Sequence, residues 1–381
     1  AAGPERPLVR TPTEPVFRWL ILLGILTVIG GLVFELAVWR PVLFGRGASE
    51  ALGRAGDLLA ARLSRVTWLA MALFLMASVG QLLVQTSGQQ GIAWYNSLGR
   101  PVVTVLAQTG WGHLWLWRMG SFIVVAVLLA AEGLRRRSDG TPSLKAAALV
   151  AGGGLLLTLS LASHGAATSG LRLEAVFSDY LHLLGAGLWG GGLMHVAFGL
   201  PLLMTGLPPK ERAVALAAIV ARFSTIATMC VGVLIITGLY SAWAQVTVVR
   251  AVTTPYGRTL LVKAALIMPL LLLGGLNLLW VKPRLVREEG AAHWLRRFVT
   301  SEAALMSLVL LSVGMLTSME PARQTASRLA TEEAGRLSFN DTVEGTRIKM
   351  IVEPARLGPN LFTIALTDRS GRPIKNASDV T

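Results

Sequence analysis

Three histidines and one aspartate are the side chains of this chain whose positions best suit a metal site. Asp179 and His182 are three positions apart, so a helix places them on one face. His164 ends the preceding apolar stretch, and His113 begins an earlier one. Nitrogen and oxygen ligands suit Cu(II), Zn and related ions. The sequence predicts that these four residues converge at one membrane face. The alternative is that each caps a helix end as an interfacial polar residue.

A fourth histidine, His195, predicts a second and deeper position. It follows His182 by 13 residues, or about 20 Å along a straight helix, so the two cannot share one ion. Met194 adjoins His195, and Met229 and Cys230 lie on the next apolar stretch. Soft sulfur ligands select Cu(I), so Met194 and His195 are candidate metal ligands or relay residues. Core filling by these sulfur-containing side chains is the alternative interpretation.

The elements that must position these residues are long apolar stretches. The chain has 381 residues, of which 53% are hydrophobic and 15% charged, with a mean hydropathy of +0.59. About 20 helical residues cross a bilayer core of about 30 Å. The composition and spacing predict an all-α polytopic membrane bundle of about eight transmembrane helices. We place the spans at Phe17–Val38, Val66–Thr86, His113–Gly133, Leu144–Ser163, Val176–Met204, Phe223–Trp243, Thr259–Val281 and Glu302–Met319. A shorter apolar piece, Leu98–Thr109, is predicted to lie at the interface or to re-enter.

The segments outside the spans have a different character. Two strands are predicted at Arg347–Val352 and Leu361–Thr367, followed by a turn over residues 368–371. They indicate the start of an extracytoplasmic β-sandwich, and we expect the ends of a longer protein to lie beyond this sequence. The predicted organisation is a linker at 1–16, a transmembrane domain at 17–320, a linker at 321–336 and a partial β-domain at 337–381.

The distribution of positive charge over the loops predicts how the helical bundle is oriented in the membrane. The formal net charge is +14, and most Lys and Arg residues fall on alternate loops of the bundle. The positive-inside rule places these loops in the cytoplasm, so both termini are expected outside it. An excess of positive charge in so apolar a chain indicates membrane lipid as a contact, and no nucleic-acid partner is expected.

Glycine and buried charge mark the interior of the predicted bundle. The segment Gly185–Gly192 is rich in glycine, which lets neighbouring helices approach closely, and Gly152–Gly154 is its predicted packing partner. Arg118 lies inside a span and needs a partner or water. Lys263 lies near a span end, where it can reach solvent or neutralise Asp179 or Glu174.

Two further functional interpretations stay open at this level. Histidines 13 apart on one helix resemble the ligands of membrane b-type haems, so haem b is an alternative cofactor, with His182 paired to His113 or His164. A non-catalytic accessory subunit of a larger membrane complex is the other alternative. The chain lacks the nucleophile elbow, the HExxH motif, the Walker loop and the dinucleotide fingerprint, so it is not expected to be an enzyme.

A series of short motifs resembles a known family. The series is strongest within 155–285, and it resembles the CopD copper-resistance membrane family. Residues 346–381 resemble the start of a YtkA-like β-sandwich domain. The motifs are Ser163-His164-Gly165-Ala166, Asp179-Tyr180-Leu181-His182, Leu188-Trp189-Gly190-Gly191-Gly192-Leu193, Arg222-Phe223-Ser224, Thr237-Gly238-Leu239-Tyr240 and Tyr256-Gly257-Arg258-Thr259-Leu260-Leu261-Val262-Lys263.

The resemblance implies a function for the bundle. It implies copper movement across a bacterial inner (cytoplasmic) membrane, with copper received from a periplasmic or extracellular CopC-like carrier. It carries over His164, Asp179, His182 and His195 as candidate residues. The oxidation state of the copper, Cu(I) or Cu(II), stays open.

Overall fold

The computed structural model describes most of the chain in two units. One unit is helical and falls within 1–245 and 255–320; the other falls within 246–254 and 321–381. We describe each unit by itself. The described residues are 13–135, 144–163, 172–245, 254–288, 290–319, 337–343, 346–353, 355, 359–368 and 370–374.

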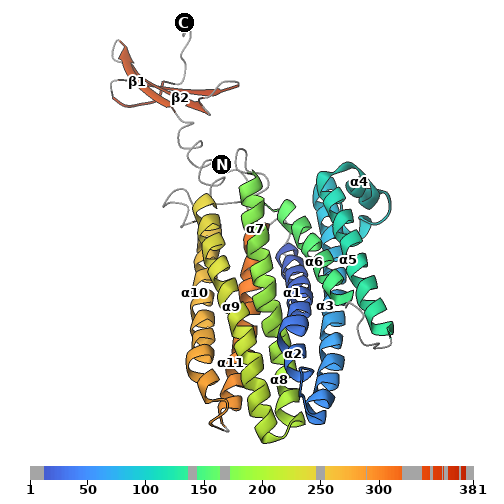
Figure 1. The fold of residues 1–381 in the computed structure, drawn as a ribbon. Helices are drawn as coiled ribbons and strands as arrows, with labels where there is room; N and C mark the ends of the chain where they lie inside the picture. The colour runs from blue at the N-terminus through green and yellow to red at the C-terminus, as the bar shows by residue number, and fades with distance from the viewer. Residues whose placement is uncertain are drawn as a thin grey trace. The chain divides into compact units, whose positions relative to one another are not determined.

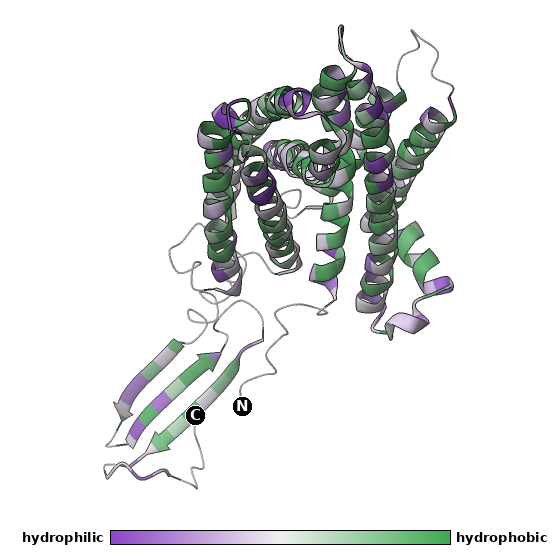
Figure 2. Cartoon of the chain, turned by 90° about the horizontal axis from the view of Figure 1, so that it is seen from below, coloured by the Kyte–Doolittle hydropathy of each residue, from purple (hydrophilic) through white to green (hydrophobic). Residues whose placement is uncertain are grey.

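The helical unit confirms the predicted membrane bundle. The described residues hold eight helical segments long and apolar enough to cross a membrane. Figure 1 shows how these helices are arranged, and Figure 2 shows that apolar residues predominate along them. The spans are α1–η1–α2 (Glu14–Val33, Phe34–Trp39, Arg40–Leu43), α3 (Glu50–Gln90), α5 (Gly110–Leu134), α6 (Leu144–Leu161), α7–η4–α8 (Arg172–Ala186, Gly187–Gly191, Gly192–Gly206), α9 (Pro209–Gln245), α10–η6–η7 (Pro255–Leu276, Asn277–Val281, Lys282–Arg284) and α11 (Ala291–Ser318).

Helix α1 forms the centre of the unit. It packs against α3, α6, α8, η4 and α11. In the span Glu14–Leu43, 72% of the most apolar 18-residue stretch is buried inside the protein. A helix that is apolar on all sides needs protein or lipid on all sides, and neighbouring helices supply most of that cover here. The first predicted span is therefore the core element around which the others are arranged.

Three spans begin well before their predicted starts. Helix α3 begins at Glu50, α9 at Pro209 and α11 at Ala291, each in a charged segment that precedes the apolar stretch. The hydroxyl of Ser49 accepts a hydrogen bond from the backbone N–H of Leu52 (3.2 Å), which caps α3. The same hydroxyl donates to the Glu211 carboxylate (2.6 Å), so the first turns of α3 and α9 are tied together.

The short apolar piece is a separate helix. The segment predicted at the interface forms α4 (Arg100–Gln108), which follows the 3₁₀ turn η2 (Trp94–Asn96). It packs against α3 and α5. Its nine residues span about 14 Å, too little to cross a bilayer.

Three spans contain a π-helical segment. These segments are η1, η4 and η6, and such wide turns inside α-helices are frequent at functional sites. The backbones of α1 and η4 meet directly, because a Cβ added to Gly30 would lie 2.3 Å from the carbonyl oxygen of Gly187 and the amide nitrogen of Gly192. The glycine segment therefore packs on Gly30 of α1. The predicted partner, Gly152–Gly154, was wrong: Gly152 instead faces Ile29 of α1.

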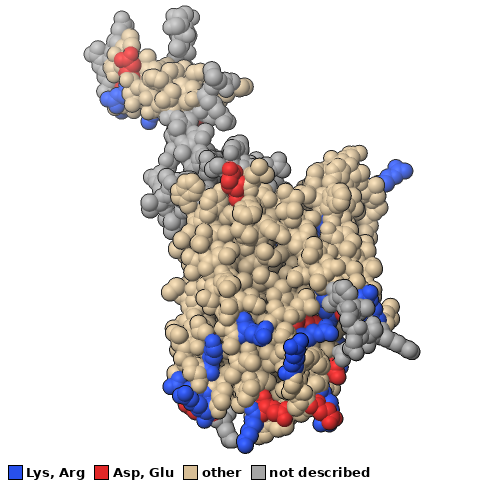
Figure 3. All heavy atoms as spheres, viewed as in Figure 1, with Lys and Arg blue, Asp and Glu red and all other residues tan. Residues whose placement is uncertain are grey.

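Positive charge gathers at one end of the helical unit. In Figure 3 most of the visible Lys and Arg side chains lie at the end where α2 leads to α3 and α8 leads to α9. The opposite end, which holds α4 and the start of α7, shows few of them. This is the charge asymmetry that the loops of the sequence predict.

The second unit is a small antiparallel sheet. Strands β1 (Leu337–Val343), β2 (Thr346–Glu353) and β3 (Leu361–Thr367) lie in the order β1-β2-β3. The sequence predicted β2 and β3, whereas β1 was missed because Asn340 and Asp341 are poor strand formers. The predicted turn forms, since the backbone N–H of Gly371 bonds to the carbonyl of Asp368 (3.0 Å). A hydrogen bond from the Ser370 hydroxyl (2.6 Å) helps to hold the pKa of Asp368 below its usual value.

Candidate metal-binding site on helix α7

His182 on α7 is held by one ring nitrogen. Its Nδ1 lies 2.8 Å from the hydroxyl oxygen of Thr237 on α9. That hydroxyl gives its only proton to the carbonyl of Val233 (2.7 Å), so Nδ1 must be the donor to Thr237. In the neutral ring Nε2 then carries a lone pair, and it has no hydrogen-bond partner among the described residues. A histidine fixed in this way through one nitrogen has the other ready for a metal ion.

Asp179 lies one turn before His182 and is half-buried. Its carboxylate has Ser160 and Ser163 as neighbours. The two hydroxyls are buried, and they do not meet hydrogen-bond geometry with any described group. These oxygen atoms place additional polar groups beside the carboxylate, at the end of α6 that precedes His164.

Lys263 supplies a positive charge that acts on this pair. It lies on α10, and its ammonium group interacts electrostatically with both Asp179 and His182. An opposite charge within a few ångströms offsets the cost of a carboxylate in an apolar bundle. Lys263 therefore compensates Asp179 as we predicted. The positive charge of Lys263 would repel a cation bound at Asp179 and His182.

The remaining predicted ligands of this site do not gather around His182 in the part of the chain that is described. His164 lies outside the described residues. His113 is exposed at the start of α5, where its Nε2 donates to the carbonyl of Ala107 (3.0 Å) on α4. Helix α6 packs between α5 and α7, so His113 and His182 belong to different sides of α6. The described residues hold no group of three or more His, Cys, Asp or Glu side chains able to bind a metal ion.

His195 is enclosed by protein. It is 1% exposed, and its Nδ1 donates to the carbonyl of Gly191 (3.0 Å) while Nε2 lies 3.3 Å from the hydroxyl of Thr67. The ring fits against Gly31 of α1, where an added Cβ would lie 2.2 Å from its Cε1. Both ring nitrogens thus have protein partners, and a metal at His195 has to displace Thr67.

The predicted sulfur atoms are dispersed around this histidine. Met194 is half-buried and packs with the apolar core, and Cys230 is buried in the same core. Met229 is 68% exposed on the surface of the bundle. A thioether-lined position built from all three is therefore not formed in the described structure, and Met194 with His195 stays a prediction.

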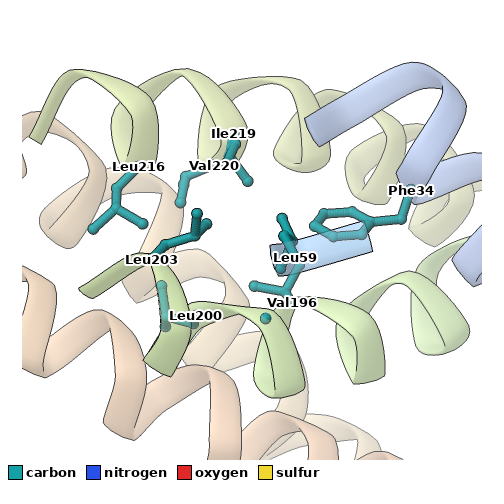
Figure 4. A pocket seen from close by; sticks show the side chains of 9 residues that line it. Phe34, Leu59, Val196, Leu200, Leu203, Leu216, Ile219 and Val220 are labelled. Atoms are coloured by element: carbon teal, nitrogen blue, oxygen red, sulfur yellow. The ribbon is translucent and has the colours of Figure 1, made fainter. Parts of the chain in front are cut away.

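The apolar cavity of Figure 4 offers no ligands. It lies beyond His195 on α8, between α8 and α9 and the side chains of Phe34 and Leu59. Every residue that lines it is apolar or glycine. The cavity is a packing gap of the bundle and contributes no metal-binding chemistry.

Arg118 has the partners that the sequence demanded. It is 3% exposed on α5. Its guanidinium donates to the hydroxyl of Thr158 (3.4 Å) on α6 and to the side-chain carbonyl of Gln81 (3.5 Å) on α3. These long bonds to neutral groups fix three helices together, and they do not bring Arg118 to His182.

The structure brings Thr237 to His182, a contact that the sequence motif alone did not predict. The pattern Thr237-Gly238 places a hydroxyl beside a residue without a side chain. A Cβ on Gly238 would lie 3.7 Å from Cε1 of His182, so the imidazole rests against this glycine. A threonine followed by glycine inside a span was the available signal.

Comparison with known proteins gives a consistent family. A family model described as Copper resistance protein D-like, N-terminal domain, matches residues 10–175, and one described as Copper resistance protein D matches residues 217–316. The copper transport protein CutJ of Bacillus subtilis (strain 168) is 26% identical over 367 residues, which are 95% of this chain and 62% of CutJ. The inner membrane protein YebZ of Escherichia coli (strain K12) is 26% identical over 266 residues, which are 69% of this chain and 87% of YebZ.

The matches cover only part of CutJ and reach different parts of this chain. The chain spans less than two thirds of the length of CutJ. No solved structure matches. The YtkA-like resemblance of the C-terminal unit stays a prediction. Together the two family models account for most of the helical unit, on either side of η4 and α8, and the chain belongs to the CopD family of copper-resistance membrane proteins.

Proposed function

We propose that this protein receives copper at a site built on His182 and Asp179 and moves it across or into the membrane. The observation that carries the proposal is the state of the His182 ring: Thr237 fixes Nδ1, and Nε2 has no hydrogen-bond partner among the described residues. Membership of a copper-resistance family and the name of CutJ support copper as the cargo. The protein acts as a carrier, without a catalytic step.

His164 is the proposed third ligand of this site. It follows Ser163, whose hydroxyl lies beside the Asp179 carboxylate. A histidine from the segment after α6 would give the copper a second nitrogen ligand, and imidazole suits copper. His113 is the weaker candidate, because its Nε2 is bonded to Ala107. Further passage along α8 would bring copper to Met194 and His195.

The proposed location is a bacterial inner membrane, with the basic end of the bundle in the cytoplasm. The positive-inside rule supports this orientation, and the similarity to the inner membrane protein YebZ supports the location in that membrane. It places His182 and Asp179 toward the non-cytoplasmic face and both termini outside the cytoplasm. A CopC-like carrier on that face would deliver the copper.

The test is the copper content of purified protein. His182→Ala removes an imidazole whose Nδ1 is held by Thr237 of a second helix and whose Nε2 has no hydrogen-bond partner among the described residues. We expect this variant to bind at least tenfold less copper than the wild-type protein, since a fixed imidazole ligand is lost. Asp179→Asn and His164→Ala are expected to weaken binding as well. Metal analysis after equilibration with Cu(I) or Cu(II) measures each case and assigns the oxidation state.

The matched control is His293→Ala. His293 is an exposed residue near the start of α11 and is expected to leave copper binding unchanged. Unchanged copper content in His182→Ala would refute the site. A visible spectrum of the same samples distinguishes the haem alternative, because a reducible Soret band lost in His182→Ala would assign His182 to haem.

A further inference from the structure

Glu302 is a buried carboxyl that the copper site does not use. It lies on α11, eleven residues after the helix begins at Ala291, and is 4% exposed. Helices α1, α8 and α10 and the π-helical segment η6 pack around α11. A carboxylate buried this deeply in a membrane bundle is costly unless a proton or another charge compensates it.

One oxygen atom of Glu302 has a partner and the other faces a glycine. The side-chain N–H of Asn277, the first residue of η6, donates to Oε1 of Glu302. The other oxygen, Oε2, lies toward Gly274, where an added Cβ would be 3.9 Å away. The amide oxygen of Asn277 is itself buried and has no donor among the described residues. The pair therefore holds one hydrogen bond and has room for a second.

No charged side chain of the described residues acts electrostatically on Glu302. On α1, Glu14 and Arg18 pair with each other (2.7 Å). On α8, His195 bonds Gly191 and Thr67. The surrounding elements hold further ionisable groups. They are Glu35, which pairs with Lys145; Tyr256, Arg258 and Lys263 on α10, the last of which acts on Asp179; Lys282 and Arg284 on η7; and His293, Arg296 and Arg297 on α11 itself.

We propose that Glu302 and Asn277 form a proton-binding site in the core of the bundle. A proton on Oε2 removes the uncompensated charge and provides the donor that the amide oxygen of Asn277 lacks. The acid and the amide then satisfy each other. A metal ion fits less well, because the two residues offer only two free oxygen atoms, and hard cations take about six or more.

The site is placed to respond to movements of the helices. Asn277 begins a π-helical turn, and Met306 lies one turn after Glu302 on α11. The Met306 sulfur packs on Gly190 of η4, where an added Cβ would lie 3.1 Å away. The same helix face thus contacts both η6 and η4. Release of the proton breaks the O–H bond of the carboxyl, passes the proton to water, and leaves a carboxylate whose charge an arriving cation can balance.

The first test measures the proton directly. Infrared spectra of the membrane-reconstituted protein at neutral pH are expected to contain the carbonyl stretch of a protonated carboxyl, lost in Glu302→Gln. Glutamine keeps an oxygen and an N–H₂ group, so the contact with Asn277 is preserved and the variant should fold. The control is Glu14→Gln: Glu14 is also buried but is ion-paired to Arg18, so the band should remain.

An unchanged protonated-carboxyl band in Glu302→Gln would mean that Glu302 is ionised, and the proposal would fall. A second test concerns coupling and rests on the proposed copper function. In proteoliposomes containing a pH-sensitive dye, addition of copper should move protons in wild-type protein and in Glu14→Gln, but only at background level in Glu302→Gln. Copper-driven proton movement that persists in Glu302→Gln would show that Glu302 does not couple the two.

The two proposals fail separately. If His182→Ala keeps its copper, the proposed copper site is wrong, whereas the infrared band of Glu302 is unaffected. If the band is absent while His182→Ala loses copper, the proton site is wrong and the copper site stands.

Discussion

At the scale of single residues, the state of an imidazole depends on what its neighbours can donate. His182 and His195 lie on one continuous span, yet they differ in how many of their ring nitrogens have a hydrogen-bond partner among the described residues. The hydroxyl of Thr237 accepts from His182 at one nitrogen only, whereas Gly191 and Thr67 occupy both nitrogens of His195. The two histidines are thus unequal ligands, although their residue type is the same.

Thr237→Val tests the positioning of His182. Valine has nearly the same shape, but it leaves the Nδ1 proton of His182 without an acceptor and the ring free to turn. Loss of such a partner typically reduces metal affinity by about 10–100-fold. We expect this reduction in the affinity for copper, measured by competition with a chelator of known affinity.

Thr228→Val on the same helix is the control for this prediction. Thr228 is exposed, and its hydroxyl bonds to the carbonyl of Ser224 (2.8 Å) on its own helix, so copper affinity should stay at the wild-type value. Equal affinities for Thr237→Val and the wild-type protein would show that the Thr237 contact does not position the ligand.

At the scale of elements, the contact between α1 and η4 depends on glycine. A Cβ on Gly191 would lie 1.8 Å from the carbonyl oxygen of Leu26, and one on Gly30 would collide with the backbone of η4. Backbone atoms cannot move aside as a side chain can. Close approach here brings the span that carries His182 and His195 against the central helix.

Gly30→Ala is therefore expected to destabilise the bundle. The added methyl group forces α1 and η4 apart, and overpacking of this kind costs about 1–3 kcal/mol. The thermal midpoint in detergent should fall by several degrees. Gly154→Ala is the matched change, because an added Cβ meets nothing within 4 Å there, and it should leave the midpoint unchanged or raise it slightly. Similar midpoints for both variants would contradict the role of Gly30.

At the scale of the whole molecule, the distribution of charge predicts the orientation in the membrane. The two ends of the helical unit differ in Lys and Arg content (Figure 3). The start of α3, where Arg54 lies in the sequence, is at the basic end, and α4, which follows Leu98, is at the opposite end (Figure 1). The positive-inside rule places Arg54 in the cytoplasm and Leu98 outside it.

Cysteine labelling measures this orientation. Cys230 is the only cysteine and is replaced first by alanine. In that background, Leu98→Cys should react with a membrane-impermeant maleimide in intact spheroplasts, and Arg54→Cys should react only after lysis. Both side chains are exposed, Leu98 at 70% and Arg54 at 73%, so access from the proper side is assured. The reverse labelling pattern would overturn the predicted topology.

The amino-acid sequence by itself determined the membrane bundle, its spans, its charge asymmetry and its family. These properties follow from the composition, from the length of each apolar stretch compared with the thickness of the bilayer core, and from local motifs. All of these are features of the linear sequence. The strand β1 was missed because Asn340 and Asp341 have weak strand propensity. The early starts of α3, α9 and α11 were missed because these first turns carry charged residues and lie outside the apolar stretches from which the spans were predicted.

Only the tertiary structure decided which residues meet. It separated His113 from His182 by placing α6 between their helices, and it paired the glycine segment with Gly30. It also joined Asn277 to Glu302, 25 residues further along the chain. The order in which helices pack depends on side-chain shape summed over entire faces, so no short motif encodes it.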